Sequence, residues 1–167
     1  MKRIIALLAA ATLLTGNAKA EVVYSDSNVR FTLVDESTVR MEYAPDGKFI
    51  DNKSFVAVER SYAPVKHTRK VSGKKLTIAT SQLTLTYKIG SGAFTNGNLK
   101  IAGTKAAGTR EISWTPGMQQ KSNLKGTYRT LDGYDGNMRG DKPMPIEDGL
   151  LARDGWTLID DSHSLLF

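Results

Sequence analysis

The run from 148 to 156 (Asp-Gly-Leu-Leu-Ala-Arg-Asp-Gly-Trp) concentrates side chains that could bind a ligand. Arg153 precedes Asp154, and an arginine beside an aspartate favours the ionised carboxylate. Trp156 follows two residues later and offers a ring face for stacking. We therefore interpret Arg153, Asp154 and Trp156 as candidate binding residues. The alternative is that Asp154 is a turn aspartate preceding a strand.

The other neighbouring carboxylates are poorly placed for acid–base catalysis. Asp160 and Asp161 are adjacent, and adjacent side chains of a strand point to opposite faces, so they cannot easily flank one glycosidic bond. Asp132 and Asp135 lie in a glycine-rich turn, where aspartate more often bonds its own backbone. The sequence therefore predicts no catalytic pair.

The sequence also contains no motif for metal binding, thiol chemistry or phosphate binding. His67 and His163 are the only histidines and have no second ligand at a metal-site spacing, so we interpret them as surface or loop residues. The chain has no cysteine, hence no thiol nucleophile. The loop at 90–92 lacks the Lys-Ser/Thr pair of a phosphate-binding loop. We expect neither a metal nor a cofactor.

Residues 1–20 have the order of a secretory signal peptide. A basic start at 1–3 precedes an apolar run at 4–14 and a small-residue cleavage site at 18–20. The apolar run is too short to span a membrane, although a buried N-terminal helix is an alternative. We expect an exported protein, periplasmic or secreted, with no membrane span once the signal is removed.

Composition and length argue against several classes of protein. Removing residues 1–20 takes away three basic residues and no acid, so the formal charge falls from +6 to +3. We interpret the remaining lysines and arginines as scattered among acids on a solvated surface, which argues against a nucleic-acid partner. The 147 residues that remain suffice for one domain but not for a (β/α)₈ barrel, which needs about 200.

Short segments of alternating apolar and polar residues, separated by turn residues, indicate strands rather than helices. Spacing of about ten residues between them favours an all-β fold, an antiparallel β-sandwich spanning 21–167. Trp114 is interpreted as a core residue, with a sugar-stacking platform as the alternative. The expected strands are 29–33, 39–43, 55–58, 65–71, 76–78, 83–87, 98–101, 111–114 and 156–159.

Two blocks, Asn-Leu-Lys-Gly-Thr-Tyr-Arg-Thr-Leu-Asp-Gly at 123–133 and the run at 148–162, resemble the N-terminal domain of glycoside hydrolase family 31. The similarity is greatest to exported bacterial α-glucosidases and α-xylosidases. It implies a galactose-mutarotase-like N-terminal sandwich followed by a catalytic (β/α)₈ barrel. The family's retaining hydrolysis of α-glycosides uses two aspartates on that barrel, so no catalytic residue is expected in this chain.

The resemblance also implies a supporting role for the loop-rich segment 123–161. In the family, a loop of the N-terminal domain reaches the barrel mouth, where an acidic residue contacts the sugar. Arg153 and Asp154 are the nearest match and Asp148 is the alternative, with an insert at 134–145 between the blocks. The implied partners are an α-linked oligosaccharide and the barrel of the same chain.

The chain reaches its last residue within an apolar run, Leu165-Leu166-Phe167, without a polar tail. We therefore expect a fragment of a longer enzyme, inactive by itself. The alternative is a free-standing, non-catalytic sandwich that binds carbohydrate or mediates adhesion.

Overall fold

The computed structural model describes residues 21–103, 112–125, 138–139, 142–143 and 148–167. The predicted signal peptide, the pair Asp132 and Asp135 and most of the insert at 134–145 lie outside these residues. The regular structure of the described residues consists of antiparallel strands, with no helix among them. The expectation of an all-β chain is confirmed for this part of the sequence.

The smaller sheet has three strands in the order β1 (Glu21–Ser25), β2 (Val29–Leu33) and β3 (Val39–Tyr43). Alternation along β2 puts Val29, Phe31 and Leu33 on the inner face, where each is at most 1% exposed. The Asp26 carboxylate stabilises the β1–β2 turn because its Oδ1 accepts hydrogen bonds from the Asn28 and Val29 amides. The predicted β2–β3 hairpin is confirmed.

The larger sheet has five strands, arranged in chain order. The turn between its first two strands has Gly73 at φ +57°, a conformation that glycine adopts without the usual steric cost. A separate pair is formed by β9 (Met138–Arg139) and β10 (Lys142–Pro143). The five strands are β4 (Thr68–Ser72), β5 (Lys75–Ala79), β6 (Leu83–Lys88), β7 (Leu99–Gly103) and β8 (Ser113–Trp114).

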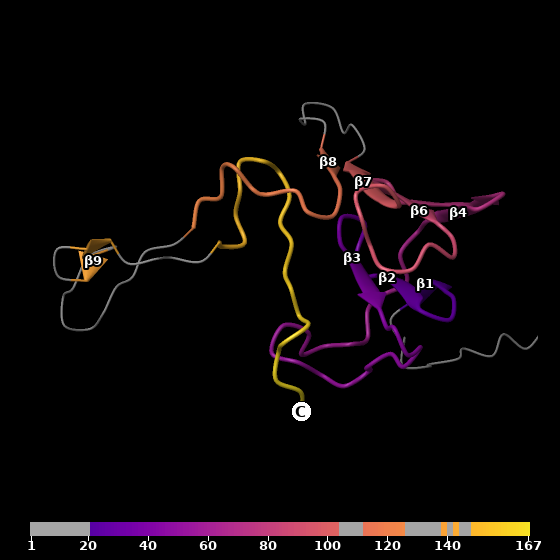
Figure 1. Cartoon of the computed structure of the whole chain (residues 1–167), viewed down its shortest axis with the longest axis horizontal. Helices are drawn as coiled ribbons and strands as arrows, with labels where there is room; N and C mark the ends of the chain where they lie inside the picture. The colour runs from indigo at the N-terminus through magenta and orange to yellow at the C-terminus, as the bar shows by residue number, and fades with distance from the viewer. Residues whose placement is uncertain (1–20, 104–111, 126–137, 140–141, 144–147) are drawn as a thin grey trace, which may run out of the picture.

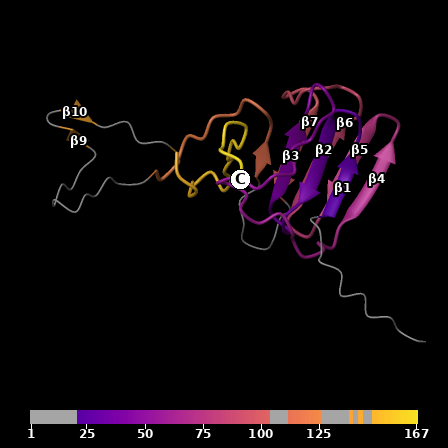
Figure 2. The same cartoon turned by 90° about the horizontal axis from the view of Figure 1, so that it is seen from below.

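The two sheets pack face to face, as Figure 2 shows, and their inner side chains form one hydrophobic core. Phe31 from the smaller sheet lies at the centre of an aromatic cluster. Its ring centroid is 5.4 Å from that of Tyr87, 5.6 Å from that of Phe94 and 6.0 Å from that of Tyr24. Trp114 is 7% exposed and belongs to the same core, as expected.

Two expected strands are wrong. Residues 55–58 form a tight turn instead, because the Ser54 amide donates to the Ala57 carbonyl and the Ala57 amide donates to Ser54 Oγ. These two bonds fold back a segment that a strand would need to keep extended. Residues 156–159 pair with no neighbouring strand among the described residues, and Leu158 and Ile159 remain exposed. Both segments were misassigned as strands because apolar content alone does not show that a segment pairs with a neighbouring strand.

Truncating Phe31 to alanine should cost about 3–5 kcal/mol of stability, because the side chain is fully buried between the sheets. Thermal unfolding followed by circular dichroism measures this loss. Lys70→Ala, on the exposed strand β4, is the matched control and should change stability by less than about 0.5 kcal/mol. Equal melting temperatures for the two variants would contradict the assignment of Phe31 to the core.

Candidate functional site

Residues 123–125, the described part of the first sequence block, lie beside the segment that carries the predicted binding residues. Asn123 and Ala152 form an isolated antiparallel bridge. The Leu124 amide donates to the Leu151 carbonyl at 2.8 Å, and the Arg153 amide donates to the Ser122 carbonyl at 2.9 Å. We call the paired segments, residues 120–125 and 148–156, the clasp; Figure 1 shows them as adjacent orange and yellow traces.

The Asn123 side chain holds the clasp together. Its Nδ2 donates to the Gly149 carbonyl at 2.9 Å and to Gln120 Oε1 at 2.6 Å. Its Oδ1 accepts from the amides of Gly149 at 2.9 Å and Lys125 at 2.7 Å. A Cβ at position 149 would lie 2.9 Å from the Lys125 carbonyl oxygen, so the close approach of the two segments requires glycine there.

Asp154 bonds to the facing segment of the clasp through one carboxylate oxygen. Its Oδ2 accepts hydrogen bonds from the backbone amides of Ser122 at 2.7 Å and Lys121 at 3.0 Å. Among the described residues, no partner is found for its other oxygen, Oδ1. The half-buried carboxylate is thus fixed by the backbone on one side and available on the other, where it can accept hydrogen bonds from a ligand's hydroxyl groups.

The other predicted residues lie on the clasp in different settings. Asp148 is exposed, with its Oδ1 3.6 Å from the Lys125 ammonium. Arg153 is exposed, and no ion pair joins it to Asp154. Trp156 is half-buried and packs against the core, with its ring centroid 6.3 Å from that of Trp114. Its carbonyl also accepts a hydrogen bond from the Gln120 side-chain amide.

A polar network that the sequence did not reveal lies on the outer face of the smaller sheet. Arg30 makes a two-pronged contact with Glu42, with nitrogen–oxygen distances of 2.7 and 2.8 Å, and also lies 2.7 Å from Asp51. Its guanidinium stands 4.6 Å from the Phe49 ring centroid. Arg40, on the neighbouring strand, approaches the same Glu42 carboxylate at 3.3 Å. These contacts tie the 49–51 loop to β2 and β3.

Asp161 connects this network to the C-terminal segment. Its Oδ2 lies 3.1 Å from Arg40 Nη1, and both of its oxygens accept from the Ser54 hydroxyl, at 2.8 and 2.9 Å. Ser54 is completely buried. These partners are separated from Asp161 by more than a hundred positions in sequence, so no local spacing could have indicated the contact.

Burial of Asp161 by itself would raise the pKa of its carboxyl group. Hydrogen bonds from Ser54 and Ser164, together with the Arg40 guanidinium, outweigh burial and hold that pKa below its usual value. The pKa of Asp160 is also lowered, by hydrogen bonds from the Ser162 hydroxyl and amide. Both aspartates are therefore charged at neutral pH and bonded to other residues of the protein, as expected of structural rather than acid–base residues.

The described residues include no group of three metal-capable side chains. His67 bonds through Nδ1 to the Val65 carbonyl at 2.8 Å, and His163 is exposed on a different segment. A search of the same part of the chain finds no helix long and apolar enough to cross a membrane. The clasp, with its anchored carboxylate, remains the best candidate for a substrate contact.

Comparison of the chain with protein-family models finds no matching family, and comparison with curated proteins finds no significant match.

Replacing Asp161 with asparagine should lower stability at pH 7 by about 1–3 kcal/mol, because Arg40 would lose one of its two charged partners and keep only Glu42. A lowered carboxyl pKa stabilises the fold above the unfolded value of about 3.9, and this stabilisation disappears as pH falls through the folded-state pKa. The difference from the native protein should therefore shrink as pH falls below the unfolded-state pKa of about 3.9. Urea unfolding across this pH range measures it.

Glu36→Gln is the control, since this exposed carboxylate makes no side-chain contact with the described residues. A pH-independent deficit in Asp161→Asn would contradict an ionic role for Asp161.

Proposed function

We propose that this chain is the N-terminal, substrate-site-supporting domain of an exported retaining α-glycosidase of glycoside hydrolase family 31. The parent enzyme hydrolyses α-glucosides or α-xylosides, and its catalytic aspartates lie on a (β/α)₈ barrel of the same polypeptide. The observation that supports the proposal is the clasp, in which the described start of the first family-like block, residues 123–125, pairs with the second block next to Asp154.

The clasp has the properties that a supporting sugar contact needs. Two backbone amides fix the orientation of the Asp154 carboxylate, and its Oδ1 is left for a ligand. A carboxylate oxygen accepts hydrogen bonds from sugar hydroxyls, and a charged acceptor binds more strongly than a neutral one. Arg153 and Asp148 extend from the same paired segments, where both are exposed. They are the secondary candidates for contacts with the oligosaccharide.

An exposed apolar surface supports a multidomain parent over a free-standing module. Leu166 forms a bridge with Ser54, the Phe167 amide donates to the Lys53 carbonyl, and the Phe55 and Phe167 rings meet edge to face at 5.6 Å. The apolar side chains on these segments are 45–71% exposed, which is unfavourable in water unless a partner covers them. They are Phe55, Val56, Val58, Leu165, Leu166 and Phe167. We assign the covering role to the catalytic barrel.

The proposal predicts that the chain of residues 1–167 lacks hydrolase activity, whereas a longer product of the same gene has it. The measurement is release of p-nitrophenol from the α-glucoside and the α-xyloside by both proteins, with the β-anomers as controls. Activity confined to the longer product and to α-anomers is the expected result, and the preferred substrate identifies the sugar. Activity of the 1–167 chain itself would overturn the assignment.

Two substitutions of Asp154 in the longer enzyme separate sugar binding from support of the clasp. Asp154→Asn keeps one oxygen for the Ser122 and Lys121 amides but replaces the other with an NH₂ group. We expect it to raise KM or lower kcat/KM roughly tenfold or more without changing the melting temperature. Asp154→Ala should show the same kinetic defect and also lower the melting temperature, because the two amides lose their acceptor.

Asn123→Ala is the matched control, since it opens the clasp without removing a charge. Native kinetics for Asp154→Asn would remove Asp154 from the sugar site.

A further inference from the structure

The outer face of the larger sheet is basic. Strand register puts Ser72, Lys75 and Lys88 in one row across β4, β5 and β6. A second row runs from Lys70 through Thr77 and Thr86 to Lys100. Both rows alternate with the buried residues of β5 and β6, so their side chains point away from the core. Lys74, in the β4–β5 turn, lies beside the first row. We call these side chains the lysine face.

No acidic side chain balances these charges within the sheet. The sequence from 60 to 110 contains neither aspartate nor glutamate, so basic residues are not evenly mixed with acids as the composition suggested. Among the described residues, no carboxylate lies within 4.0 Å of any of these lysine ammonium groups. The five lysines therefore repel one another, with no counter-charge from the part of the chain that the structure describes. They are Lys70, Lys74, Lys75, Lys88 and Lys100.

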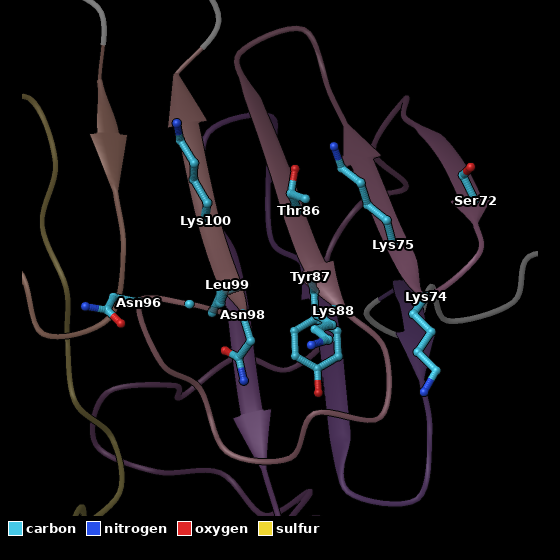
Figure 3. A pocket seen from close by; sticks show the side chains of 11 residues that line it. Ser72, Lys74, Lys75, Thr86, Tyr87, Lys88, Asn96, Asn98, Leu99 and Lys100 are labelled. Carbon is cyan, nitrogen blue, oxygen red and sulfur yellow. The ribbon is translucent and has the colours of Figure 1, made fainter.

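The lysine face is hollowed into an open depression of about 440 Å³. Figure 3 shows Lys75, Thr86 and Lys100 spread across three neighbouring strands, with Asn98 beside them. Neighbouring strands are about 4.8 Å apart, so the row from Lys70 to Lys100 spans roughly 14 Å. That width suits an extended molecule carrying several negative charges better than a single small anion.

We propose that the lysine face binds an anionic polysaccharide whose repeating units carry carboxylates. Ammonium groups attract the carboxylates, while the hydroxyls of Thr77 and Thr86 can hydrogen-bond the sugar hydroxyls between them. This inference does not depend on the clasp, which lies on other segments of the chain. Binding at the lysine face attaches the protein to an acidic glycan surface, and this role is separate from hydrolysis of an α-glycoside.

Two other polyanions fit this face less well. Single-stranded nucleic acid is usually bound with aromatic rings that stack on bases, but the one aromatic residue lining the depression, Tyr87, is 1% exposed and points into the core. An anionic membrane surface is usually bound with apolar side chains that enter the headgroup region. The apolar residue lining the depression, Leu99, is likewise buried.

The test compares binding of the full 1–167 chain to polygalacturonate and to hydroxyethyl cellulose, an uncharged β-glucan, by affinity electrophoresis at several salt concentrations. We expect retardation by polygalacturonate alone, weakening as salt rises because exposed charges are screened. The double variant Lys75→Glu/Lys88→Glu should bind at least about tenfold more weakly. Lys75→Gln/Lys88→Gln should give a smaller loss of binding. Because this variant adds no acidic residue, it tests whether the loss in the glutamate variant is caused by misfolding.

Lys48→Glu/Lys53→Glu is the matched control, with the same change in net charge at exposed positions outside the larger sheet. It should bind polygalacturonate nearly as well as the native protein. Equal weakening by both glutamate pairs, or no binding by the native chain, would overturn the proposal. Tighter binding to single-stranded DNA or to phosphatidylserine vesicles, lost in Lys75→Glu/Lys88→Glu, would reassign the face to that partner.

Discussion

The packing of Phe31 against Tyr87 across the two sheets is the contact on which the rest of the molecule depends. A sheet with one apolar face must bury that face against another element. Once the inner faces are joined, only the two outer faces, the strand ends and the connecting segments remain for function. Every candidate site described above lies in one of these places.

The outer faces of the two sheets differ in how their positive charges are compensated. On the smaller sheet, arginines of β2 and β3 are neutralised by Glu42, Asp51 and Asp161, and the 49–58 loop and the C-terminal segment are held there. On the larger sheet the lysines have no such partners among the described residues. Paired charges fix a protein's own segments, whereas unpaired like charges favour an external counter-charge. The first face is accordingly structural and the second is suited to a ligand.

Asp154 combines a structural and a binding property in one side chain. Asp154 lies in a turn, as the alternative interpretation expected, but the strand expected to follow it is not formed and its two hydrogen bonds come from the facing segment. Its Oδ1, which has no partner among the described residues, agrees with a ligand contact. The two interpretations are therefore compatible, because a carboxylate has two oxygens and the clasp uses one. Trp156 differs, since packing on Trp114 and the core already occupies part of its surface.

The sequence by itself determined the strand pattern of β2, β3, β5 and β6, because alternation with period two reports directly which side chains face the core. It also placed Trp114 in the core. It misassigned 55–58 and 156–159, where apolar residues lie outside any ladder. Only the tertiary structure showed the Arg40–Asp161–Ser54 contacts and gathered the lysines of four strands on one face. Both depend on register and on contacts between residues far apart in the chain, which local sequence patterns do not encode.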